Sequence, residues 1–296
     1  MGFPRYPKGS YHRNFNEFLE MIEATATDPI LFTEVDEKEK ELENYIYSSM
    51  KSDEIATKFF HKLQELHLTK FEKKLGSGAV GTVVQLQGTH KYSNLPLALK
   101  LQAFSQENTL HPTEIRGDVV ALNLPRNKQL ANAYGVFAYD GNNVNFIEKF
   151  NPTLHAGQVV ISTLTRAING ETLYSRMQKG PLPLHLTKTY CKQIAEGIHA
   201  IHQAGYAHRD IHVENILIEN NSISIIDFGL AAETNEKQTQ KDWRKFGYIL
   251  AEIGGKELLF NPEFFDLVYS DHHGLLNGNK PYTGKQILTH PFFKSF

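Results

Sequence analysis

The chain has 296 residues, 41% of them hydrophobic and 22% charged, so it can bury a sizeable core as one large domain or two smaller ones. Thirty-one basic and thirty-three acidic residues give a net charge of −2, which argues against a protein that mainly binds nucleic acid or anionic membranes. The single cysteine, Cys191, excludes an internal disulfide framework and favours a reducing, cytoplasmic compartment. No stretch approaches the roughly 18 apolar residues of a membrane span, and we expect no secretory signal at the N-terminus.

Residues 1–69 differ in pattern from the rest of the chain and predict a helical N-terminal extension. Two sets of apolar residues recur there at helical spacing. They are Phe15, Phe18, Leu19 and Ile22, and then Ile55, Phe59, Leu63 and Leu66. The acidic run at 34–43 between them is typical of a solvated helix face. Because this region has no catalytic motif, we expect it to pack on the following domain or to bind a regulatory partner.

From about residue 70 the pattern becomes that of β-strands and then of helices. Strands are predicted at 71–75, in the Val-rich run after GSGAVG, in PLALKLQ (96–102) and at 158–166, with a hairpin turn at 140–143. Further on, Ile194, Ile198 and Ile201 have helical spacing, and Gly205 is well placed as the C-cap. Strands followed by helices predict an α+β chain in two lobes with a crevice between them.

A glycine-rich run, Gly76-Ser77-Gly78-Ala79-Val80-Gly81, lies between the first two predicted strands. Residues without a Cβ let backbone N–H groups approach phosphate oxygens closely. Such a run alone is weak evidence, because ordinary hairpins also contain it. It is followed by Thr82-Val83 and more strand rather than by a helix, which disfavours a dinucleotide-binding fold.

Lys100 ends an apolar strand nineteen residues after Gly81. It either points to water at a sheet edge or holds a positive charge over phosphates, steadied by a carboxylate. We predict Glu114, near the start of a helical stretch, as that carboxylate; Glu107 and Asp118 are the alternatives.

The segment HRDIHVEN, residues 208–215, combines acid, base and amide side chains before an apolar run. Asn215 follows Asp210 by five residues, and Asp227 follows it by seventeen, behind a second apolar run. A carboxylate and an amide oxygen on loops beside a short hairpin can reach the same hard cation, and Mg²⁺ prefers such ligands. Asp210 is then available to accept a proton from an attacking hydroxyl.

Four motifs occur in order: G-x-G-x-x-G-x-V at 76–83, L-A-L-K at 97–100, H-R-D-x-x-x-x-N at 208–215 and D-F-G at 227–229. The set resembles that of the protein kinase superfamily. The resemblance covers about 70–296, with an N-lobe at about 70–166 and a C-lobe at about 167–296. Residues 242–253 look like the helix after the activation segment, with Asp242 at its start, and 283–293 look like the closing helix and tail.

The resemblance implies an ATP-dependent phosphotransferase with Mg²⁺ as its ion, or Mn²⁺ in its place, acting on a Ser or Thr hydroxyl of a protein. It implies that Lys100, held by Glu114, orients the phosphates, that Asp210 acts on the acceptor, and that Asn215 and Asp227 bind the metal. His208 would anchor the catalytic loop, and His199 and His202 are expected on a helix face. The residues implied for nucleotide contact are Gly76, Ser77, Gly78, Ala79, Val80, Gly81, Val83, Ala98, Lys100, Leu164, Thr165, Ala167, Glu171 and Leu217.

Three departures from the family pattern bear on function. His212 stands where serine/threonine kinases usually carry a lysine, so we count it among the catalytic residues, and the form H-x-D-x-H-x-x-N looks like small-molecule kinases. Only fourteen residues (228–241) separate Asp227 from Asp242, with no A-P-E, and no arginine follows Arg244. Arg209 is therefore expected to bridge local carbonyls or an acid, and activity is expected without activation-loop control.

These departures are similar to those of bacterial effector kinases, for which the location would be the host cytosol. Two other functions remain open on the same fold. One is a kinase of small molecules or lipid headgroups, favoured by His212. The other is a pseudokinase scaffold, disfavoured because all catalytic positions are filled.

Overall fold

The computed structural model describes residues 12–14, 71–77, 82–86, 97–103, 112–139, 144–147, 160–278 and 281–294. The chain forms two compact units, one of Met1–Leu122 with Ala133–Ile168 and one of Asn123–Asn132 with Asn169–Phe296. The apolar helices predicted within residues 1–69, the glycine-run residues 78–81 and the turn at 140–143 lie outside the described residues.

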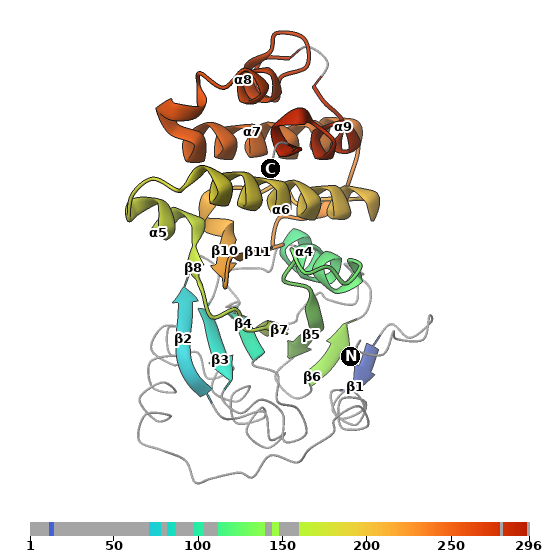
Figure 1. The fold of residues 1–296 in the computed structure, drawn as a ribbon. Helices are drawn as coiled ribbons and strands as arrows, with labels where there is room; N and C mark the ends of the chain where they lie inside the picture. Colours follow the sequence, from blue (N-terminus) through green and yellow to red (C-terminus); the bar gives the residue numbers. More distant parts are fainter. Residues whose placement is uncertain are drawn as a thin grey trace. The chain divides into compact units, whose positions relative to one another are not determined.

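The first unit is built on a seven-stranded antiparallel sheet (Figure 1). Its order is β1-β6-β5-β7-β4-β3-β2. The strands are β1 (His12–Asn14), β2 (Phe71–Ser77), β3 (Thr82–Leu86), β4 (Leu97–Ala103), β5 (Ala133–Tyr139), β6 (Val144–Ile147) and β7 (Val160–Arg166). All the strands predicted from residue 71 onward are confirmed. The prediction worked because Val- and Leu-rich runs suit the half-buried surface of a sheet.

The centre of this sheet is the β4–β7 ladder, which pairs Leu97 with Arg166 and Ala103 with Val160. Leu99, Leu101 and Leu164 on these strands are buried. Helix α4 (Pro112–Asn123) belongs to the same unit and buries Val119 and Val120. The predicted helix around Glu114 is therefore confirmed, and it lies in the same unit as Lys100.

Strand β1 is a finding that the sequence pattern did not predict. His12–Asn14 belongs to the extension that we expected to be helical, yet it pairs antiparallel with Asn145–Ile147 of β6. In the sheet order β1 stands at the edge, beyond β6. Three polar residues have no periodicity of their own, so only the partner strand reveals this pairing.

The second unit is mainly helical. Its helices are α5 (Leu173–Gln178), α6 (Leu184–Gln203), α7 (Glu236–Leu258), α8 (Pro262–Tyr269) and α9 (Gly284–Leu288), with single 3₁₀ turns η1 (Val213–Asn215) and η2 (Pro291–Phe293). Helix α6 buries the predicted stripe of Ile194, Ile198 and Ile201, and α7 buries Phe246 and Leu250 in the same core. Figure 1 shows α6 and α7 side by side.

Gly205 ends α6 as predicted, since its φ of 86° lies in the left-handed region that favours glycine. Its N–H donates to the carbonyl of His202 at 3.0 Å. The next strand, β9 (Tyr206–Ala207), therefore leaves the helix in a fixed direction and leads directly into His208.

A short hairpin follows the polar segment. Strands β10 (Ile216–Glu219) and β11 (Ser222–Ile225) pair antiparallel through a turn at Asn220 and Asn221, both with positive φ, as a two-residue hairpin needs. The third strand of this sheet is β8 (Glu171–Thr172), which pairs with Leu217 and Ile218. Residues 123–132 also join this unit, because Ile225 exchanges backbone hydrogen bonds with Gln129 and Ala131.

One boundary in the C-terminal part differs from the sequence prediction. Helix α7 begins at Glu236, six residues before Asp242, because the side chain of Asn235 caps it by accepting from Gln238 N–H. The closing helix and tail expected at 283–293 are α9 and, from Pro291, the 3₁₀ turn η2.

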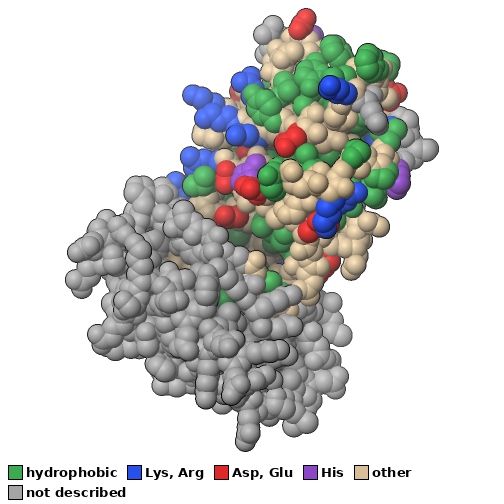
Figure 2. All heavy atoms as spheres, turned by 90° about the vertical axis from the view of Figure 1, so that its left-hand side faces the viewer, with side chains coloured by type: hydrophobic (Ala, Val, Ile, Leu, Met, Phe, Trp, Pro, Cys, Tyr) green, Lys and Arg blue, Asp and Glu red, His purple; other side chains and the backbone are tan. Residues whose placement is uncertain are grey.

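The structure thus confirms an α+β fold with a β-rich unit and a helical unit. In the described part of the chain, no helix is long and apolar enough to cross a membrane. Figure 2 shows one face of the helical unit, where hydrophobic side chains cover much of the upper part and several Lys and Arg side chains gather along the left edge. Phe260, two residues after the end of α7, is 90% exposed.

Candidate active site

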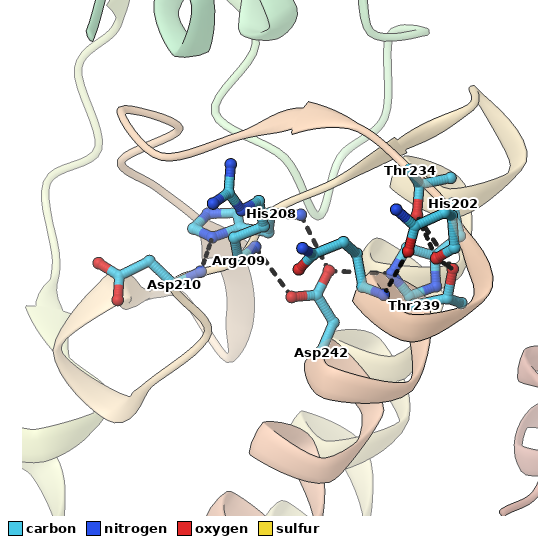
Figure 3. A network of polar contacts seen from close by, with 9 residues as sticks. His202, His208, Arg209, Asp210, Thr234, Thr239 and Asp242 are labelled. Carbon is cyan, nitrogen blue, oxygen red and sulfur yellow. Dashed lines mark hydrogen bonds and ion pairs between the residues drawn. The ribbon is translucent and has the colours of Figure 1, made fainter. Parts of the chain in front are cut away.

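Asp242 is the centre of the polar network in the helical unit (Figure 3). This carboxylate is 1% exposed. It accepts hydrogen bonds from the backbone N–H of His208 at 2.9 Å and of Arg209 at 2.8 Å, and it contacts His202 Nε2 at 2.9 Å. A buried carboxylate is stable only when its oxygens are well paired, so these donors and Asp242 hold each other in place. The first residues of the HRD segment are therefore fixed to helix α7.

His208 connects this network to the strand that precedes Asp227. Burial lowers the pKa of His208, with the nearby Asp242 as a smaller opposing effect, so the ring is neutral near pH 7. Its Nε2 lies 3.0 Å from the Ile226 carbonyl, and its Nδ1 accepts from the N–H of Asp210 at 3.3 Å. Both contacts require the proton on Nε2. His208 also packs against Phe228, with ring centroids 4.9 Å apart, and so it anchors the loop as predicted.

Asp210 and Asn215 face each other across the loop. The Asn215 amide donates to the Asp210 carbonyl at 2.9 Å and to the Asp210 carboxylate at 3.1 Å. Because the amide nitrogen makes both bonds, the amide oxygen is left as an acceptor for another group. The Asp210 side chain is 40% exposed and the Asn215 residue is 7% exposed. The loop therefore presents an accessible carboxylate whose orientation is set by a buried amide.

Asp227 lies next to Asn215, because Ile226 N–H donates to the Asn215 carbonyl at 3.0 Å. Asp227 is exposed, and its carboxylate accepts from Gly229 N–H at 3.2 Å. The side chains available here are one carboxylate and one amide oxygen, which is the donor set that Mg²⁺ prefers alongside phosphate and water oxygens. The residues present thus fit a magnesium ion.

Two residues of this site, Arg209 and Asp227, have left-handed backbones with φ of 70° and 57°. Such conformations cost on the order of 1–3 kcal/mol for a residue with a side chain and cluster at functional sites. The hydrogen bonds from Arg209 N–H to Asp242 and from Gly229 N–H to Asp227 hold them. The guanidinium of Arg209 is exposed and makes no hydrogen bond or ion pair within the described residues, so our expectation that it bridges a carbonyl or acid is wrong.

His212 lies among acidic side chains. Its Nε2 is 3.5 Å from the carboxylate of Asp210, and its Nδ1 is 3.8 Å from that of Glu214. The structure therefore brings three of the predicted residues, Asp210, His212 and Asn215, together on one loop, with Asp227 beside them.

In the β-rich unit, Lys100 on β4 lies 4.0 Å from the carboxylate of Asp118 on α4. The side chain of Lys100 is 18% exposed and that of Asp118 is 4% exposed. Glu114, which we ranked above Asp118, is one helical turn earlier on α4, and its side chain lies outside the described residues. Residues four apart share a helix face, so Glu114 and Asp118 lie on the same side of α4. The helix was predicted correctly, and the partner of Lys100 that the structure describes is Asp118.

The other predicted nucleotide contacts are distributed over both units. Gly76 and Ser77 end strand β2, and the side chain of Ser77, like residues 78–81 (Gly78, Ala79, Val80 and Gly81), lies outside the described part. Val83 is half-buried on β3 opposite Lys100, and Ala98, Leu164 and Ala167 are buried, whereas Thr165 is half-buried. In the helical unit, Glu171 pairs with Lys179 at 2.7 Å and with Ile218 across β8–β10, next to Leu217.

The segment between Asp227 and α7 consists only of residues 228–235, and its backbone hydrogen bonds join it to residues 205–207. Strand β12 (Ala232–Glu233) pairs with β9, and Thr234 N–H donates to the Gly205 carbonyl at 2.9 Å. The hydroxyls of Thr234 and Thr239 lie 3.0 Å apart, and they are 3.2 and 3.0 Å from the Asn235 carbonyl. This segment is therefore tied to the start of the HRD loop by backbone hydrogen bonds.

The sequence prediction missed one member of the site. His202 lies on helix α6 as expected, but the sequence assigned it no role; it is half-buried and contacts Asp242, with the ring of Trp243 5.4 Å away. Its spacing of six residues before His208 carries no signal by itself. His202 on α6 and Asp242 on α7 meet only because these two helices pack against each other.

The comparisons with known proteins agree with this arrangement. Residues 69–255 match the model of the protein kinase domain. The chain is 28% identical over 177 residues to a serine/threonine-protein kinase of Candida glabrata, covering 55% of this chain and 26% of that protein. It is 26% identical over 229 residues to the NUAK family SNF1-like kinase 1 of Mus musculus, covering 77% and 29%. It is 31% identical over 136 residues to the serine/threonine-protein kinase PknE of Mycobacterium tuberculosis, covering 41% and 22%.

The chain spans less than a third of the length of each of these relatives. The kinase-domain match, however, extends over more than half of this chain and includes both the Lys100 strand and the Asp210 loop. The chain therefore belongs to the protein kinase family.

Proposed function

We propose that this chain is an ATP- and magnesium-dependent protein kinase that transfers the γ-phosphate to a Ser or Thr hydroxyl. One observation carries the proposal: the Asn215 amide bonds both the carboxylate and the carbonyl of Asp210, directly beside Asp227. This arrangement supports a base for the acceptor and one metal ligand, Asn215, on the 208–215 loop, with a second oxygen ligand, Asp227, beside it. Similarity to serine/threonine kinases supports the choice of acceptor.

In this proposal Asp210 positions the acceptor hydroxyl and takes its proton. Its carboxylate is accessible, and its backbone is fixed on one side by His208 and on the other by Asn215. Asn215 and Asp227 would hold the magnesium ion, which when bound neutralises charge on the transferred phosphate. Lys100, with Asp118 beside it, would orient the phosphates. Alignment and charge neutralisation, rather than covalent chemistry by the protein, would then supply the rate.

We further propose that activity does not require phosphorylation of the segment after Asp227. Three features support this: the segment has only eight residues before α7, the β9–β12 pairing fixes it, and Asp242 already holds the HRD backbone. A phosphate would have little left to order.

A second candidate function is phosphorylation of a small molecule or lipid headgroup on the same loop. His212, 3.5 Å from Asp210, favours it, because a point-charge lysine that steadies the phosphate is absent from this position. The short segment at 228–235 also provides a smaller surface on which a peptide substrate could bind.

The two functions are separated by incubating the protein with labelled ATP and magnesium, once with a protein lysate and once with a metabolite pool. We expect label in protein and autophosphorylation mapped by mass spectrometry to Ser or Thr. Label only in the metabolite pool would support the second candidate. Nucleotide binding by thermal shift with no transfer to any acceptor would contradict both and indicate a scaffold.

A further inference from the structure

Helix α7 has a row of cations on its exposed side. Lys237, Lys241, Arg244 and Lys245, which we call the cationic stripe, are all exposed. At roughly 100° per residue their directions fall within an arc of about 100°, and the row is about 12 Å long. Exposed Tyr248 continues it, and Glu252 one turn further on marks its end.

The stripe is not explained by the fold. The side chains of its four members make no ion pair or hydrogen bond with any residue that the structure describes. Like charges four residues apart, such as Lys237 with Lys241 and Lys241 with Lys245, destabilise a helix. Lys237 also occupies the first turn, where the helix dipole favours acids. The four cations therefore weaken α7 slightly.

The stripe lies on the same turns of α7 that hold the catalytic loop. Asp242, between Lys241 and Arg244, is buried and bonds the backbone of His208 and Arg209. The stripe is on the exposed side of these turns, so about one helix diameter of 10–12 Å separates it from the loop. An extended peptide crosses that distance in about four residues.

We propose that the cationic stripe is a docking surface for an acidic segment of the protein substrate, located about four or more residues from the phosphorylated hydroxyl. This deepens the proposed function and rests on it for the acceptor. A single narrow row of four cations matches a short acidic peptide. The chain as a whole carries a net charge of −2, which suits neither an anionic membrane nor a nucleic acid as the partner.

The direct test is peptide binding without nucleotide. The probes are a synthetic peptide with one Ser and a block of Glu residues about four positions away, and the same peptide with Gln in place of Glu. The stripe variant is K237Q/K241Q/R244Q/K245Q. The matched control, K128Q/K256Q/K285Q/K294Q, removes the same charge from exposed positions elsewhere on the helical unit.

We expect the full chain to bind the Glu peptide more tightly than the Gln peptide, with the difference falling as salt is added. The stripe variant should bind the Glu peptide about tenfold more weakly, since each exposed charge contact contributes only modestly. The control variant should bind like the parent. Equal binding of both peptides, or equal loss in both variants, would overturn the proposal.

Further measurements distinguish an acidic peptide from an anionic membrane or RNA as the partner, and docking from the proposed kinase activity. Loss of binding to anionic vesicles or to RNA in the stripe variant, with peptide binding unchanged, would assign the stripe to those partners and overturn it. Transfer of phosphate equally to both peptides would also overturn it. If the Glu peptide binds through the stripe but no protein or peptide acceptor is ever phosphorylated, docking stands and the proposed function fails.

Discussion

Two buried carboxylates, one in each unit, act in different ways: Asp242 holds the backbone just before Asp210, and Asp118 lies beside Lys100. Asp242 accepts two backbone N–H groups and contacts a histidine at 2.8–2.9 Å, so it fixes the path of the chain. Asp118 lies 4.0 Å from the ammonium of Lys100, a charged group at the end of a flexible side chain. The first carboxylate shapes the fold of its loop, whereas the second tunes the position of one charge. Their replacement should therefore affect different measurements.

The largest effect is expected from D242A. Removing the carboxylate leaves the backbone N–H groups of His208 and Arg209 unsatisfied and frees the left-handed backbone of Arg209, at a cost of about 3 kcal/mol or more. Chemical denaturation should show this loss of unfolding free energy, and transfer activity should disappear with it. E252A, at an exposed position of the same helix, is the control and should remain within about 0.5 kcal/mol of the parent. Equal stability of D242A and E252A would contradict the anchoring role.

The next effect separates the candidate partners of Lys100. K100M should lower kcat/KM by about 10²–10³ through loss of a charge on the phosphates. D118N should lower it less, and E114Q less still, if Asp118 is the functional partner. A greater loss in E114Q than in D118N would restore Glu114 to the role that the sequence suggested.

A smaller effect is expected from the pH dependence of stability. Burial lowers the folded-state pKa of His208 below its ordinary value of 6.5, so the unfolded chain binds more protons as the pH falls. The contribution of His208 to stability is complete above that unfolded pKa and is lost as the pH drops from about 6.5 toward the lower folded value. Unfolding free energy measured from pH 7 to pH 5 should fall less steeply in H208Q than in the parent. Parallel curves would show that His208 does not carry this dependence.

The smallest effect is expected from T234A/T239A. These hydroxyls bond each other and the Asn235 carbonyl, while the segment is held by backbone pairing with β9. Transfer rates should change by less than about twofold, because surface changes of this kind are usually within ±0.5 kcal/mol. Loss of turnover in the double variant would show that phosphorylation or hydroxyl contacts of this segment are required.

Periodicity and motif spacing predicted most of the described helices and strands, because these elements depend on local residue preferences. The helix containing Ile194, Ile198 and Ile201, its end at Gly205 and the hairpin after Asn215 all follow from local residue preferences. The start of α7 was misplaced because Asn235 as a cap was overlooked. The contact of His202 with Asp242 and the strand at His12 depend on partners distant in sequence. Such pairings have no local pattern to reveal them.

The central claim is that Asp210, held by Asn215 beside Asp227, acts on the acceptor hydroxyl. The most direct measurement compares D210N with the parent chain in two assays, calorimetric binding of ATP with magnesium and steady-state phosphate transfer to a Ser-containing protein acceptor. We predict nearly unchanged nucleotide affinity and transfer reduced by at least about 10². Transfer by D210N at the parent rate would contradict this account.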